Sequence, residues 1–346
     1  MVLLRLALLL LCPPLLSGCL FTYLVRSGYD QAQLLNNREP IEKVLKENKL
    51  TPEQRQKLEL TVKIRDFATT KLHLKPTNSY TTFVDLKRPY VTYIVTVAKK
   101  WELEPHLFWY PIVGSLPYKG FFKKEAAEEE AQSFDQNKFD VMVRGVSAYS
   151  TLGWFEDPLL SSMISGEDHH LVNLIIHEST HTTLYIKSQA DFNEQLATFV
   201  GNIGTEIYYK QKEGENSSTL KIIANENSDE KIFSEFISSE LKSLAAWYKT
   251  LPEKNETARL QRFSEIQTRF KTEIAPKMKT KQYAGFANMK LNNATLLYFK
   301  TYVYDLNLFQ KLYEHFGKNL NDFLAYCKSL EKSKNPHKDI EKLLAR

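Results

Sequence analysis

The sequence of 346 residues has few cysteines, few histidines, no stripe of basic residues and no long apolar run after its first twenty residues. Its three cysteines, Cys12, Cys19 and Cys327, are too few for a disulfide scaffold. The net charge is only +5, without Lys and Arg clustered among aromatic residues, so we expect no nucleic-acid partner. A membrane-spanning helix needs about 20 apolar residues, and we expect none here.

The first residues, MVLLRLALLLLCPPLLSGC, contain one early basic residue, Arg5, and then an apolar stretch from Leu6 to Leu16. This stretch has the length of the apolar core of a signal peptide. It ends in LSGC, which resembles the lipobox of bacterial lipoproteins. We therefore predict that residues 1–18 are a lipoprotein signal peptide and that Cys19 carries the lipid. The alternative is an ordinary cleaved signal peptide.

The residue after the predicted lipidation site is Leu20, whereas Asp at this position usually retains a lipoprotein in the inner membrane. We therefore expect a lipid anchor in the outer membrane of a bacterial cell envelope, with the protein facing the periplasm. Cys327 would be the only free thiol of the mature chain. No intramolecular disulfide could form, and a small buried apolar role is expected for Cys327.

Residues 19–346 are long enough for a single domain. Residues 20–75 have helical spacing, and Thr51 followed by Pro52 predicts the start of a second helix. We divide the domain into a helix-and-sheet part, about 20–165, and a helical part, about 166–346.

Three segments rich in β-branched and aromatic residues predict strands of one small sheet, at 90–98, 107–113 and 139–146. The Ala-rich, charged segment 123–134 between them predicts a solvated helix. Two polar segments, 210–219 and 225–230, are expected to be loops because neither can bury an apolar face. The predicted fold class is α+β, a small β-sheet within a mostly helical domain.

The local motif that points to chemistry is HESTH at residues 177–181, which follows the apolar run LVNLII. Residues four apart lie on one face of a helix, so His177 and His181 can bind one Zn²⁺ ion. Glu178 lies one position away, where it can act as general base toward a water and then protonate a leaving amine. The alternative is a helix whose polar residues occur here by chance. Burial favours zinc, because unsatisfied imidazoles cost about 1–3 kcal/mol each.

A catalytic zinc site needs a third protein ligand, and residues 188–204 supply a candidate. Ser188 and Asp191 resemble a capping box, so we expect a new helix to begin there, with Asp191 as a cap. Glu194 lies in the second turn. The acids Asp191 and Glu206 are rival ligands, and a surface carboxylate is the alternative role for Glu194.

The helical face that carries Glu194 continues with small residues, Ala197, Thr198 and Gly201. Because these follow Glu194 at spacings of three, four and seven, they lie on one stripe. A small stripe allows close approach of the HESTH helix, which Glu194 needs to reach the metal.

Seven blocks of this sequence, between about residues 65 and 302, resemble a family of predicted zinc aminopeptidases that occur as bacterial lipoproteins. The blocks are RDFA, SY with DLKRPYV, PIVGSLPYKGFF, GVSAYSTLGWFEDPLLSSM, HESTH, FNEQLATFVG and LNNATLLYFKTY. The resemblance implies a zincin-like, more narrowly gluzincin-like, metallopeptidase domain. It implies zinc held by His177, His181 and Glu194, with Glu178 as base.

The sequence departs from the family pattern at two places. Tyr110 and Ser115 stand where the family often has cysteines, so the family disulfide is absent. Some gluzincins have an Asp four residues after the ligand Glu, which orients a zinc-binding His. Thr198 stands there in this sequence, and its hydroxyl can accept a weaker hydrogen bond.

A metallopeptidase also needs a donor for the tetrahedral oxyanion, and Tyr149 and Tyr302 are the candidates. The alternative role for each is a core aromatic side chain. His169 and His170 are expected to be solvated near the start of the zinc helix. The sequence therefore predicts a lipid-anchored zinc aminopeptidase acting on peptide or protein substrates. An envelope endopeptidase and a lipoprotein scaffold with a structural zinc are the alternatives.

Overall fold

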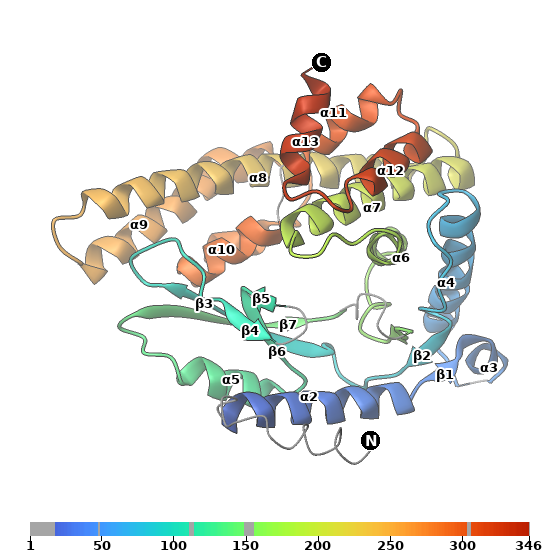
Figure 1. Ribbon diagram of the computed structural model, residues 1–346, viewed down its shortest axis with the longest axis horizontal. Helices are drawn as coiled ribbons and strands as arrows, with labels where there is room; N and C mark the ends of the chain where they lie inside the picture. Colours follow the sequence, from blue (N-terminus) through green and yellow to red (C-terminus); the bar gives the residue numbers. More distant parts are fainter. Residues whose placement is uncertain (1–17, 48, 111–113, 149–155, 303–305, 346) are drawn as a thin grey trace, which may run out of the picture.

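The computed structural model describes residues 18–47, 49–110, 114–148, 156–302 and 306–345. The fold is α+β and mostly helical, as predicted, and three small sheets lie among the helices (Figure 1). The long helix α8, Ser218–Thr250, crosses the upper half of the molecule, and α2, Gly18–Asn36, lies along its lower edge (Figure 1). The predicted signal peptide, apart from Gly18, falls outside the described residues.

The N-terminal segment is helical, as its spacing predicts. After α2 come the short strand β1, Glu39–Pro40, the helix α3, Ile41–Lys46, and the helix α4, Pro52–Thr70. The start of α4 at Thr51 is confirmed in detail. The Thr51 hydroxyl accepts a hydrogen bond from the Gln54 N–H, and the Gln54 side chain accepts one from the Thr51 N–H.

The strands of the described residues form three sheets, so the prediction that the three segments belong to one small sheet is wrong. In the main sheet, β3 lies between β6 and β7 and is antiparallel to both. The segment after residue 107 does not join it, because β4 turns back and pairs with β5 in a hairpin. The third sheet has the order β1-β2-β8. The strand bounds are β2 Thr82–Val84, β3 Thr92–Lys99, β4 Phe108–Tyr110, β5 Gly114–Leu116, β6 Tyr118–Phe121, β7 Phe139–Val146 and β8 Leu159–Leu160.

Helix α5, Lys124–Gln132, forms where the charged Ala-rich segment predicts it, and it packs on β3 through the buried Ala127. The chain is mainly helical after β8. The other bounds are α6 Asp168–Thr183, α7 Ala190–Glu213, α9 Glu256–Arg269, η1 Phe270–Ile274, η2 Ala275–Lys277, η3 Ala284–Asn288, α10 Asn293–Tyr302, α11 Asn307–His315, α12 Leu320–Ser329 and α13 Pro336–Leu344.

The predicted loop at 225–230 is wrong, because this segment lies inside α8. Its polar side chains bind neighbouring elements. Asp229 is fully buried and accepts hydrogen bonds from the N–H groups of Lys279 and Thr280. Asn227 donates to Glu206 on α7. The predicted loop at 210–219 shrinks to the four residues between α7 and α8.

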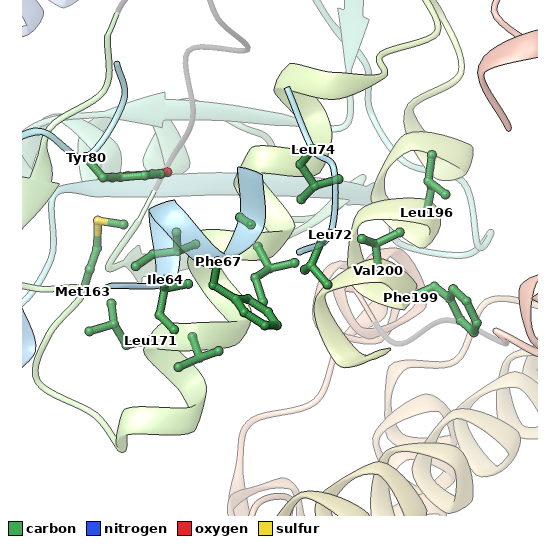
Figure 2. Close-up of a cluster of buried hydrophobic side chains, with 14 of the residues drawn as sticks. Ile64, Phe67, Leu72, Leu74, Tyr80, Met163, Leu171, Leu196, Phe199 and Val200 are labelled. Carbon is green, nitrogen blue, oxygen red and sulfur yellow. The ribbon is translucent and has the colours of Figure 1, made fainter. Parts of the chain in front are cut away.

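Figure 2 shows the apolar cluster that holds α6 in place, with Ile64 and Phe67 of α4, Leu171 of α6 and Val200 of α7 packed together. Helix α6 is buried on more than one face, including the side chains of Val172, Ile175 and Ile176. A second apolar cluster joins α8, α9 and α10, and a third lies between the main sheet and α5.

Cys327 is fully buried on α12, which confirms its predicted packing role. In the part of the chain that the structure describes, no helix combines the length and the apolar character that crossing a bilayer requires.

Candidate metal centre

His177 and His181 lie in the last two turns of α6, where the i, i+4 spacing places both imidazoles on one face. The burial of Ile175 and Ile176 fixes this end of the helix in the core. The His181 side chain is 3% exposed and that of His177 is 19% exposed. The pair is therefore held by a rigid element at the edge of the core.

Helix α7 follows after a short connection, but it does not begin with the predicted capping box. Its N-cap is Gln189, no side chain caps the helix, and Ser188 has a φ of 62°. With Ser188 in the left-handed region, its hydroxyl is not in the N-cap position. The expectation that Asp191 acts as a cap is therefore also wrong.

The connection is fixed instead by Asn193, which the sequence did not reveal as important. Its side chain is buried, accepts a hydrogen bond from the Ile186 N–H at 2.9 Å and donates one to the Ile186 carbonyl at 2.8 Å. A buried amide with both groups satisfied fixes the start of α7 relative to the end of α6. Glu194 is the next residue.

The predicted small stripe on α7 does allow close approach to α6. Ala197 is fully buried, and a Cβ atom added at Gly201 would lie 3.3 Å from the backbone oxygen of Asn173 on α6. A side chain at this position would therefore press directly on the α6 backbone.

Three potential ligand side chains converge where the two helices meet. The Nε2 atoms of His177 and His181 lie 3.2 Å apart. The Glu194 carboxylate places Oε2 at 3.5 Å from His177 Nε2 and Oε1 at 3.4 Å from His181 Nε2. The rival Glu206 is bound by Asn227 and does not belong to this group, nor does the exposed Asp191.

These spacings fit a divalent metal. Ligands at about 2.0–2.1 Å from a tetrahedral zinc ion lie about 3.3 Å apart, which matches the separations of 3.2–3.5 Å. Two imidazole nitrogens and one carboxylate are also the ligand set of an open catalytic zinc site. Nδ1 of His181 is buried and has no hydrogen-bond partner among the described residues. Nε2 is therefore the atom through which His181 contacts the group.

The three side chains influence each other's protonation. Burial lowers the pKa of His181 to about 4, with a further contribution from His177. Burial acts in the same direction on His177, but its hydrogen bond to Glu194 and the charge of Glu178 outweigh it and raise the pKa. Burial acts to raise the pKa of Glu194, and the two histidines reverse this and lower it. A carboxylate beside two imidazoles, one of them neutral, is a set that a cation can join.

Glu178, the predicted base, lies on α6 next to His177 and is half-buried. Its charge acts on His177 and also on Tyr80, a buried phenol whose pKa is raised first by burial and then by Glu178. The Glu178 charge therefore acts on the candidate ligand His177.

The predicted phenols are not placed by the structure, because Tyr149 and the Tyr302 side chain lie outside its described part. Two other phenols lie near the ligands. Burial raises the pKa of Tyr118 on β6 to about 12, and the charges of Glu194 and Glu178 add to the effect. The Tyr185 ring centroid lies 6.5 Å from that of His181. Both phenols stay protonated at neutral pH and can donate a hydrogen bond. Tyr118 is far from α6 in sequence, so no local pattern signalled it.

Thr198 does not show the predicted hydrogen bond. It is half-buried on α7, and no hydrogen bond joins its hydroxyl to His177 or His181. The prediction that His169 is solvated is wrong. His169 is not solvated but buried, and it contacts Glu226 on α8.

A comparison with protein families finds a match over residues 22–343 to the family described as "Putative aminopeptidase". This range contains α6, α7 and all three converging ligand residues. No curated protein and no solved structure matches the sequence. Because the match extends over most of the sequence and includes the site, the chain belongs to this aminopeptidase family.

Proposed function

We propose that this protein is a zinc-dependent aminopeptidase. The observation that carries the proposal is the convergence of His177, His181 and Glu194 at 3.2–3.5 Å. Glu178 lies on the same helix as the two histidines. Family membership supports the substrate class, a peptide with a free amino terminus.

The proposed roles follow from position. His177, His181 and Glu194 would hold the zinc ion, which supplies a Lewis acid for the scissile carbonyl. Glu178 accepts a proton from the attacking water and transfers it to the leaving amine. Tyr118 or Tyr185, two phenols near the candidate ligands, would donate a hydrogen bond to the oxyanion. A raised pKa keeps Tyr118 protonated for this task.

A scaffold with a structural zinc is a weaker explanation. Structural sites close the metal with four protein ligands and need no base. The group here has three ligands, and the Glu194 side chain is 34% exposed, which leaves one side of the group toward solvent.

We also propose that lipid on Cys19 anchors the protein to the outer membrane of a bacterial cell envelope, facing the periplasm. Helix α2 contains Cys19 and has an exposed apolar stripe, Phe21, Val25 and Tyr29, at intervals of four residues. Such a stripe beside a lipid chain suits the boundary between headgroups and acyl chains. Helix α2 lies at the outside of the molecule (Figure 1), which supports this placement.

The test combines metal analysis with peptide hydrolysis. We expect the purified protein to remove the first residue from peptides with a free amino terminus and to leave N-acetylated peptides intact. Glu178→Gln should keep its zinc and hydrolyse at least ~10²-fold more slowly, because the water loses its base. Cleavage of blocked peptides would instead identify an endopeptidase. Wild-type rates for Glu178→Gln would exclude Glu178 from the mechanism.

A further inference from the structure

A second group of potential metal ligands lies at the opposite end of α6 from the HESTH residues. His169 and His170 belong to the first turn of α6, and Glu226 belongs to α8. The Glu226 atom Oε2 lies 2.9 Å from His169 Nε2 and 3.2 Å from His170 Nε2. The two imidazole centroids are 4.2 Å apart. Neighbours on a helix usually point apart, yet here both rings turn toward one carboxylate oxygen.

The spacing of these atoms suits a metal ion. Ligands about 2.0–2.1 Å from zinc lie about 2.9 Å apart at right angles and about 3.3 Å apart in a tetrahedron. The separations of 2.9 and 3.2 Å fall in this range. Imidazole with carboxylate is a ligand set that binds divalent ions such as zinc, copper and nickel.

The same distances also fit two imidazoles that each donate a hydrogen bond to Glu226. The residues around the three side chains distinguish a metal site from this alternative. The three side chains line a cavity of about 160 Å³. No lysine or arginine is among its lining residues, which are His169, His170, Asn173, Asn202, Thr205, Ile223, Glu226, Asn227, Glu230 and Gln282. The volume exceeds that of one water, so an ion could keep one or more waters.

The cavity is lined by two carboxyl groups, Glu226 and Glu230, and by no basic side chain other than the two histidines. Glu230, one turn after Glu226, is half-buried, and burial raises its pKa to about 7. Among the described residues, no lysine or arginine forms an ion pair with Glu226 or Glu230. The start of α6 itself disfavours a cation through the helix dipole, and the Glu226 carboxylate opposes this effect.

We propose that His169, His170 and Glu226 form a second zinc site, distinct from the HESTH centre. His169 is buried and His170 is 56% exposed on its side chain, so the site opens to solvent on the His170 side. Zinc here joins the start of α6 to α8. It therefore fixes the helix that positions His177 and His181 at its other end.

The experiment measures zinc bound per chain by the purified full-length protein after dialysis against micromolar free Zn²⁺. We expect two equivalents for the wild type and one for Glu226→Gln. His170→Ala changes an exposed residue and should also reduce the content to one, without a folding defect by circular dichroism. His315→Ala, another exposed histidine, is the matched control and should keep two.

The variants separate this proposal from the proposed function. Glu194→Ala should lose the HESTH zinc and keep the second equivalent. A wild-type content of one, unchanged in both Glu226→Gln and His170→Ala, would overturn the second site while leaving the peptidase centre intact. A content that falls in those variants and not in Glu194→Ala would support the second site and count against the HESTH centre.

Discussion

Glu194 has a different environment from the other acids on its helix. It lies 3.4–3.5 Å from the two histidines, whereas Asp191 is exposed and Glu206 is bound by Asn227. Two imidazoles alone hold zinc weakly. We therefore expect Glu194→Ala to lose both the HESTH zinc and hydrolysis, measured by metal analysis and by peptide turnover.

The matched control is Asp191→Ala, three residues earlier on α7. No side chain caps this helix, so the substitution should change the free energy of unfolding by no more than about 0.5 kcal/mol. Zinc content should stay at the wild-type level. If Asp191→Ala lost zinc and Glu194→Ala kept it, the ligand assignment would have to be abandoned.

Glu230 gives a prediction about pH. Burial raises its pKa from 4.5 to about 7, so the folded protein holds a proton that the unfolded chain releases. This stabilisation is complete below pH 4.5 and is lost as the pH rises through about 7. With metals removed by EDTA, Glu230→Gln should exceed the wild type in stability at pH 8 by up to about 3 kcal/mol, and by much less at pH 5.

Urea unfolding at the two pH values would measure this difference. The control is Glu235→Gln, an exposed glutamate on the same helix, which should show no pH-dependent effect. An equal effect of Glu230→Gln at pH 5 and pH 8 would mean that Glu230 ionises normally in the folded protein.

For single residues, the sequence allowed prediction only where the position depends on local spacing within one helix. The i, i+4 relation of His177 and His181 and the position of Glu178 depend only on one helix. Tyr118 and Asn193 could not be predicted in this way. Tyr118 reaches the site because β6 is placed there by tertiary packing, and the bonds of Asn193 depend on the path of the connection at Ile186.

The contact between α6 and α7 depends on Gly201. An added Cβ would lie 3.2 Å from the Asn173 side chain and 3.3 Å from the Asn173 backbone oxygen, and the backbone cannot move aside easily. Gly201→Val should therefore cost about 1–3 kcal/mol of stability through overpacking. It should also weaken zinc binding, because Glu194 lies two turns away on the displaced helix.

Thermal unfolding and a zinc titration would test both effects. Gly28→Val is a suitable control, because Gly28 is also helical and has open space around its Cβ position. If Gly201→Val behaved like Gly28→Val, close helix approach would not be what brings Glu194 to the histidines.

Helices and strands were predicted correctly where the sequence pattern is periodic and local. The prediction failed where a segment is stabilised by residues far away in the sequence. Thr51 and Gln54 specify the start of α4 by themselves. The polar composition of residues 225–230 predicted a loop, but the segment is part of helix α8. Its Asp229 is buried because the N–H groups of Lys279 and Thr280, about fifty residues later, satisfy it. Neither of those contacts can be read from local composition.

In the molecule as a whole, the candidate metal centre lies on α6 and α7, whereas the predicted lipid anchor, Cys19, lies on α2. Helix α2, which contains Cys19, lies along the outside next to the sheet region, whereas α6 lies in the interior (Figure 1). An anchor at α2 would hold the protein at the bilayer without blocking α6 or α7. Catalysis and membrane attachment should therefore be separable by mutation.

We expect Cys19→Ala to move the protein from the membrane fraction to the soluble fraction of lysed cells. The exposed stripe of Phe21, Val25 and Tyr29 buries too little apolar surface to hold the chain without the acyl chains on Cys19. Cys12→Ala is the control and should stay with the membranes, because Cys12 leaves with the predicted signal peptide. The released Cys19→Ala protein should keep its zinc and its hydrolytic rate on soluble peptides. If it still sedimented with membranes after a high-salt wash, attachment would have to come from a surface of the folded domain instead of from lipid.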